Sequence, residues 1–179
     1  MIKIKTKKNS VRKESGFTLL EILLVVALTG TVFVAVFGLF SKTIKSDTEN
    51  AMEVVAANLA QEGIEIIRNK RDENLLQEDD MNSGLSGNCR PYIDSSGNAQ
   101  CSSSRSSNIG KVSGILENCS GSCSDSTPYR RYCNISRVSG ASLGEQMKVT
   151  CTVEWESMAA SGQTREVKVE SYLSNWQEY

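Results

Sequence analysis

The sequence contains no histidine, only two prolines and few aromatic residues. Without histidine, the chain cannot form the Ser-His or Cys-His pairs of nucleophilic catalysis, and it lacks a principal zinc ligand. It also contains no nucleophile motif and no phosphate-binding loop. We therefore expect that the protein is not an enzyme and that it binds no metal and no cofactor.

Charge is nearly balanced over the 179 residues but is distributed unevenly. The first sixteen residues carry six basic and one acidic side chain, which gives +5. The remainder carries 14 basic and 20 acidic side chains, which gives −6 and a total of −1. Because this larger part is mildly acidic, it offers no general attraction for nucleic acid, and we expect no nucleic-acid partner.

A near-continuous apolar run extends from Phe17 to Phe40, and its only charged residue is Glu21. As a helix the run is about 36 Å long, whereas the apolar core of a bilayer is about 30 Å thick. A helix that is apolar on every face is typical of a membrane span. A secretory signal would be shorter and would end in a small-residue cleavage site, which is missing here.

Basic residues before the run set the expected orientation. They are Lys3, Lys5, Lys7, Lys8, Arg12 and Lys13, against the single acid Glu14. Such residues stay on the cytoplasmic side, so the C-terminal part is expected outside. We expect a single-pass membrane protein whose N-terminus is cytoplasmic and whose C-terminal domain is exported.

Residues 13–21, KESGFTLLE, resemble the leader junction of type IV prepilins and pseudopilins. In that family a membrane peptidase cuts after the glycine and N-methylates the new first residue. The resemblance implies cleavage between Gly16 and Phe17, methylation of Phe17 and an assembly role for Glu21. The implied partners are the prepilin peptidase, other pilin subunits and an inner-membrane assembly platform.

The physical chemistry of Glu21 leaves two interpretations. A carboxylate in an apolar helix costs on the order of 3 kcal/mol at the bilayer centre, and less near an interface that its side chain can reach. Glu21 is therefore either an interfacial carboxylate without a function or a group that awaits a positive partner. The resemblance supplies that partner as the new N-terminal amine, from the same subunit or from a neighbour.

Residues 41–76 continue the helix without proline and become amphipathic. The apolar stripe consists of Met52, Val55, Ala56, Leu59, Gly63, Ile66 and Ile67, which recur at helical spacing. We expect this stripe to pack on a globular domain. The opposite face, with Ala57 and Ile64 among the charges, is expected to contact neighbours in a filament.

Residues 77–128 are rich in Ser, Gly, Asn and Cys, and we expect a loop region with a short helix or strand at 109–116. All six cysteines lie beyond the apolar run: Cys89, Cys101, Cys119, Cys123, Cys133 and Cys151. On the exported side, an even number of cysteines predicts disulfides. Fifteen pairings are possible, and the sequence does not choose among them.

Residues 129–179 predict an antiparallel sheet with strands at 130–138, 147–156 and 164–173. In the second of these, apolar and polar residues alternate strictly, which predicts one buried and one solvated face. The strand pair VTCTVEW and REVKVESYLSNW resembles the sheet end of minor pilins and pseudopilins. Arg130, Arg131 and Arg137 form a local basic patch, which we interpret as solvated arginines at a sheet edge.

These segments predict an α+β fold, in which a long N-terminal helix packs on a small antiparallel β-meander. The expected plan is a cleaved leader (1–16), a transmembrane half of the helix (17–40), an amphipathic half (41–76), a disulfide-stapled loop region (77–128) and a sheet (129–179). Together with this plan, the resemblance to prepilins implies a structural subunit of a type IV pilus-like or pseudopilus filament. The alternative is a membrane-anchored binding protein or adhesin that never polymerises.

Overall fold

The computed structural model describes residues 16–112, 115–119, 126–138, 146–158 and 162–176, and these residues form one helix and seven strands. The chain divides into two compact units, Met1–Ile44 and Lys45–Tyr179. The helix α1 (Leu19–Leu76) contributes its first 26 residues to the first unit and the rest to the second.

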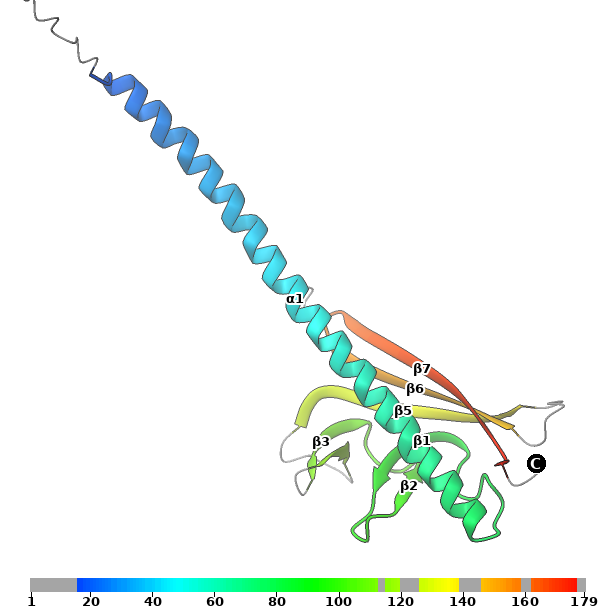
Figure 1. Ribbon diagram of the computed structural model, residues 1–179. Coiled ribbons are helices and arrows are strands. Elements are labelled where there is room, and N and C mark those ends of the chain that lie inside the picture. The colour runs from blue at the N-terminus through cyan, green and yellow to red at the C-terminus, as the bar shows by residue number, and fades with distance from the viewer. Residues whose placement is uncertain (1–15, 113–114, 120–125, 139–145, 159–161, 177–179) are drawn as a thin grey trace, which may run out of the picture. The chain divides into compact units, whose positions relative to one another are not determined.

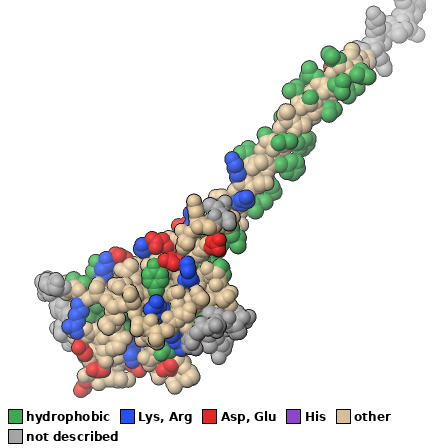
Figure 2. All heavy atoms as spheres, turned by 180° about the vertical axis from the view of Figure 1, so that it is seen from behind, with side chains coloured by type: hydrophobic (Ala, Val, Ile, Leu, Met, Phe, Trp, Pro, Cys, Tyr) green, Lys and Arg blue, Asp and Glu red, His purple; other side chains and the backbone are tan. Residues whose placement is uncertain are grey.

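In the first unit, α1 carries apolar side chains that the described residues leave uncovered. The large hydrophobic residues between Phe17 and Phe40 are each 52–77% exposed. An 18-residue window of this helix has a mean hydropathy of 2.7, and none of it is buried. Figure 2 shows apolar side chains along this part of the helix. The helix is long and apolar enough to cross a membrane, and the buried core of the protein lies elsewhere.

The second unit is built on an antiparallel sheet. Its strands are β1 (Gly87–Ile93), β2 (Ala99–Ser102), β3 (Asn108–Val112), β4 (Ile115–Asn118), β5 (Ser126–Val138), β6 (Gln146–Glu156) and β7 (Thr164–Ser174). The central strand β5 pairs with β6 along one edge and with β1 and β3 along the other. The second half of α1 lies against one face of this sheet (Figure 1).

The expected meander is present as β5, β6 and β7. The pairing of β6 with β7 is continuous from Gln146↔Ser174 to Glu156↔Thr164. The inward residues of β6 are at most 2% exposed; they are Met147, Val149, Cys151, Val153 and Trp155. The α+β fold, with a long N-terminal helix on an antiparallel sheet, is therefore confirmed.

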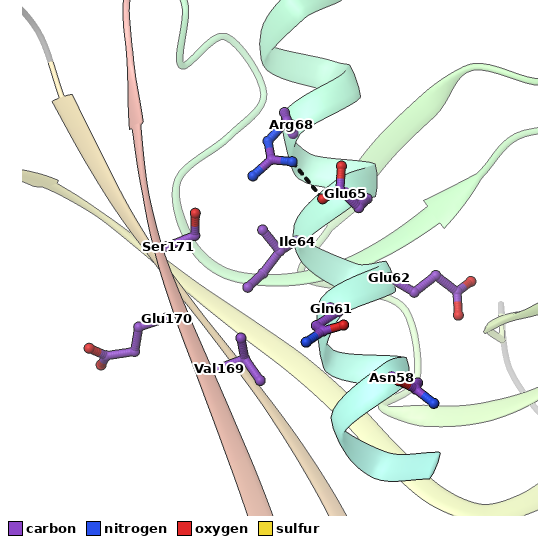
Figure 3. A pocket seen from close by; sticks show the side chains of 9 residues that line it. All are labelled: Asn58, Gln61, Glu62, Ile64, Glu65, Arg68, Val169, Glu170 and Ser171. Carbon is purple, nitrogen blue, oxygen red and sulfur yellow. Dashed lines mark hydrogen bonds and ion pairs between the residues drawn. The ribbon is translucent and has the colours of Figure 1, made fainter. Parts of the chain in front are cut away.

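The buried stripe of α1 differs in part from the one that the sequence predicts. Ala56, Leu59 and Ile67 are buried as expected, but Val55 is 43% exposed. Ile64, which we expected on the outer face, is only 4% exposed. The reason is that β7 runs beside α1, so Ile64 faces Val169 (Figure 3).

The region 77–128 contains more regular structure than its composition suggests. Instead of one short element within a loop, it supplies the four strands β1 to β4. The β1–β2 hairpin turns at Asp94, whose Oδ1 accepts hydrogen bonds from the amides of Ser96 and Asn98, each at 2.9 Å. These backbone bonds lower the pKa of Asp94. Gly97, with φ of 85°, completes the turn, so Ser, Gly and Asn here encode a hairpin.

Gly63 lies where α1 comes closest to the sheet. A Cβ atom at this position would lie 3.1 Å from Cδ of Arg131 and 3.3 Å from Sγ of both Cys133 and Cys151. Non-bonded carbon atoms pack best at about 3.5–4.0 Å, so even one methyl group would crowd this contact. Glycine therefore allows a closer approach of helix and sheet than a larger residue would without a shift of its neighbours.

We expect Gly63→Ala to lower the free energy of unfolding by about 1–2 kcal/mol, because crowding in a packed core outweighs the higher helix propensity of alanine. The control is Asn69→Ala, at an exposed position of the same helix. It gains helix propensity without a clash and should change stability by less than about 0.5 kcal/mol. Thermal unfolding followed by circular dichroism measures both. An unchanged or raised melting temperature for Gly63→Ala would contradict the close-approach argument.

Candidate functional site

The N-terminal junction begins at Gly16 and Phe17, which precede the helix. Thr18 caps α1: the amide of Glu21 donates to Thr18 Oγ1 at 3.3 Å and to Thr18 O at 3.0 Å. The spacing Thr18-x-x-Glu21 is that of a capping box, a signal that our interpretation of residues 13–21 did not use. Because Thr18 takes the Glu21 amide, the helix begins at Leu19 and the Gly16–Phe17 bond stays outside it.

Glu21 lies in the first turn of α1, where a negative charge interacts favourably with the helix dipole. It lines a shallow apolar hollow together with Phe17, Ile22, Val25 and Val26. Among the described residues, none forms an ion pair with its carboxylate. The geometry therefore places a carboxylate among apolar side chains, one helical turn from Phe17, where it can accept a positively charged group.

The described cysteines are all disulfide-bonded, as expected from their number and position. Cys89–Cys101 joins β1 to β2, with the Cα atoms 5.4 Å apart. Cys133–Cys151 joins directly opposed residues of β5 and β6, with the Cα atoms 4.0 Å apart. Cys119 is also bonded, and Cys123 lies outside the described residues. The pairing of the cysteines could not be predicted from the sequence, because it depends on the register of the strands that carry them.

The proposed patch of solvated arginines is wrong. β5 is a central strand, and Arg131 is fully buried. Arg130, one residue away, points to the opposite face, as alternation along a strand requires, and its side chain is 50% exposed. Arg137 lies near the end of β5 and pairs with Asp80 at 3.7 Å. The three arginines therefore do not form one surface.

Arg131 joins several elements of the second unit through hydrogen bonds. Its Nε donates to Asn118 Oδ1 at 3.0 Å, Nη1 to the Leu59 carbonyl at 3.0 Å, and Nη2 to the Pro91 carbonyl at 3.4 Å. Its Nη1 also lies 3.5 Å from Glu62 Oε2. Burial lowers the pKa of Arg131, while the negative charges of Glu62 and Glu117 oppose this effect. The hydrogen bonds of Arg131 therefore stabilise the helix–sheet contact and do not serve to bind a ligand.

A groove of about 410 Å³ separates α1 from β7 (Figure 3). Its lining consists of Asn58, Gln61, Glu62, Ile64, Glu65, Arg68, Val169, Glu170 and Ser171. The charges are already paired: Arg68 with Glu65, and Glu170 with Lys148 at 2.9 Å. Within the described ranges, no group of three or more Cys, Asp or Glu side chains could hold a metal ion. The N-terminal junction is therefore the stronger candidate for a functional site.

A family model described as the prokaryotic N-terminal methylation motif matches residues 11–37. The match spans Gly16, Phe17 and Glu21 and most of the apolar run. This motif is the signature of type IV prepilins, so the resemblance of the N-terminal residues is confirmed. The match does not extend into the second unit. No curated protein and no solved structure matches the chain significantly.

Replacing Arg131 with methionine should lower the free energy of unfolding by about 3 kcal/mol or more, since the buried Asn118 and two backbone carbonyls lose their donor. The matched control is Arg130→Met, on the solvated face of the same strand, which should cost less than about 1 kcal/mol. Thermal unfolding of both variants measures the difference. Equal melting temperatures would show that the buried arginine does not stabilise the fold.

Proposed function

We propose that this protein is a structural subunit of a type IV pilus-like or pseudopilus filament, matured by a prepilin peptidase. The observation that carries the proposal is the methylation motif over residues 11–37, which coincides with an apolar helix that the described domain does not cover. The motif indicates a structural subunit rather than an enzyme. In detail, the peptidase cleaves between Gly16 and Phe17 and methylates the amine of Phe17.

The exposed apolar helix can be buried in two environments, one after the other. Its side chains can be buried first in the lipid of the inner membrane, where the single span anchors the subunit. In a filament the same side chains would be buried against the equivalent helices of neighbouring subunits. The move from lipid to the filament carries no large hydrophobic cost, because the apolar surface passes from one apolar environment to another and is not exposed to water.

In the proposed filament the negative charge of Glu21 must also be neutralised. In an apolar helix bundle an unpaired carboxylate costs several kcal/mol, on the order of 3 at mid-bilayer. Cleavage at Gly16 creates an amine at Phe17, one turn away, in the same subunit or in a neighbour. Pairing of this amine with Glu21 would remove both isolated charges and fix the register of adjacent subunits.

The second unit is the exported domain in this proposal. Its disulfides are typical of proteins outside the cytoplasm. The basic residues before Gly16 favour a cytoplasmic N-terminus. A membrane-anchored protein that never polymerises would share the helix and the disulfides, but the methylation motif favours the filament subunit.

Glu21→Ala should leave membrane insertion unchanged, because it removes a charge from an apolar segment. It should reduce the share of subunit found in filaments by about tenfold or more, equivalent to about 1.4 kcal/mol per subunit. Glu21→Gln, which keeps the size of the side chain without its charge, should enter filaments as poorly as Glu21→Ala. Glu21→Asp, which keeps the charge, should enter filaments at an intermediate level. The measurement compares sheared filaments with membranes by immunoblot.

A normal share of Glu21→Ala in filaments would contradict the pairing of Glu21 with the Phe17 amine. Loss of the protein from membranes would instead show that the substitution acts before assembly.

A further inference from the structure

The sheet of the second unit ends in one long strand that is paired on one side only. Among the described residues β7 pairs with β6 alone, and the other terminal strands, β2 and β4, have only four residues each. β7 has 11 residues, contains no proline and keeps a continuous register with β6. Proteins often protect a sheet edge by a short strand, a proline or a bulge, and β7 has none of these three features.

The backbone groups on the open edge of β7 follow from the alternation of an antiparallel ladder. The Ser157 amide donates to the Gln163 carbonyl at 2.8 Å, so these opposed residues form a hydrogen-bonded pair. Such pairs recur at every second residue, so the even-numbered residues of β7 direct their backbone groups away from β6. The Ser174 carbonyl agrees with this assignment, because it accepts a hydrogen bond from Arg71 Nη1 of α1 at 3.0 Å. The central residues of this set are Glu166, Lys168, Glu170 and Tyr172.

The groove between α1 and β7 is the space beside this open edge. Val169, Glu170 and Ser171 line it on the β7 side, and α1 lines it on the other (Figure 3). Val169 packs against the hydrophobic core but is only partly buried. A further strand along β7 would lie in this groove, bind the open backbone groups and cover Val169.

The charges along β7 indicate which strand fits there. Glu166, Lys168 and Glu170 are exposed on the solvated face and alternate in sign. Charged side chains at an edge usually discourage pairing, but this order is self-complementary in an antiparallel copy. When Val169 lies opposite Val169 of a second copy, Lys168 of each copy lies opposite Glu170 of the other. This register also pairs the whole strand, Thr164–Ser174.

The neighbouring registers are less favourable. A two-fold axis through Lys168 would place this lysine opposite itself and Glu166 opposite Glu170, so that like charges meet. An axis through Val167 would again oppose unlike charges, but residues 171–174 would have no partners. The strand therefore favours pairing about Val169.

We propose that the open edge of β7 binds β7 of a second copy of this protein, antiparallel and with the two-fold axis at Val169. The contact joins the sheets of two second units into one continuous sheet. A two-fold contact is closed, so it cannot extend a filament by itself. It is therefore distinct from the contacts between apolar helices in the proposed filament, and it does not rest on that assignment.

The test places a cysteine on the proposed two-fold axis. Val169→Cys brings two thiols together across a non-hydrogen-bonded pair, whose Cα atoms are about 4.5 Å apart, within the range of a disulfide. The matched control is Val167→Cys, on the same face of the same strand. Val167 faces Ser171 of the second copy, so its two thiols would lie about 13 Å apart along the strands, too far for a bridge. The full chain is oxidised in native membranes and examined by non-reducing electrophoresis.

We expect Val169→Cys to give about tenfold or more covalent dimer than Val167→Cys, because only the first pair is within bonding distance. Wild type treated in the same way measures the background from the native cysteines. Equal yields from the two variants, or no dimer above wild type from Val169→Cys, would overturn the proposal. Dimer from Val167→Cys alone would overturn it too, because the axis would lie elsewhere.

A charge exchange in the Val169→Cys chain tests the same register without moving the thiol. Lys168→Glu should lower the yield of dimer about fivefold or more, because two like-charged pairs then face each other across the contact. Adding Glu170→Lys should restore the yield, because unlike charges again face each other.

The second exchange also removes the ion pair of Glu170 with Lys148 of the same chain, at 2.9 Å. Recovery would therefore come from the contact between copies and not from a repaired contact within one chain. An undiminished yield with Lys168→Glu, or no recovery with both substitutions, would contradict the proposed register. None of these outcomes depends on cleavage at Gly16, so a failure of the filament assignment remains distinguishable.

Discussion

The protein has one large apolar surface that its own described domain leaves uncovered, and this constraint shapes the rest of the molecule. Between Phe17 and Phe40 the large hydrophobic side chains are more than half exposed. Such a surface is stable only in lipid or against other apolar helices. The only charge between Phe17 and Phe40 is Glu21, which lies in the first helical turn. In the proposed filament the amine of Phe17 neutralises this charge.

The second half of α1 obeys a different requirement, which is close contact with a sheet. Gly63 lets the helix backbone approach the Cys133–Cys151 bridge, and Arg131 saturates buried acceptors on both the helix and the sheet. The two features lie side by side, because Arg131 Cδ is 3.1 Å from the position that a Gly63 Cβ would occupy. One helix therefore serves as an uncovered apolar segment and as one layer of a folded core.

The sequence predicted the long helix, its end near Leu76 and the three strands of the meander, because hydrophobic periodicity is strong there. The prediction from the sequence was wrong where contacts with distant parts of the chain determine which residues are buried. Ile64 is buried because β7 runs alongside the helix, and Arg131 is buried because partners distant in sequence satisfy it. Within 77–128 the sequence predicted one short helix or strand at 109–116, whereas the structure has four strands. β1 and β3 pair with β5, and β2 and β4 pair with β1 and β3, so these strands depend on pairing with other strands rather than on a pattern of their own. At the junction, Gly16, Phe17 and Glu21 could be identified from a local motif. The cap at Thr18 was recognised only from its hydrogen bond, although the capping-box spacing was also present in the sequence.

The mass of the N-terminal peptide tests most directly whether the chain is processed as a prepilin. The membrane-associated protein is purified from cells with and without the cognate peptidase, and the N-terminus is identified by mass spectrometry. A prepilin should begin at N-methylated Phe17 when the peptidase is present and at Met1 when it is absent. An intact Met1 in both samples would contradict the assignment and would favour an uncleaved membrane anchor.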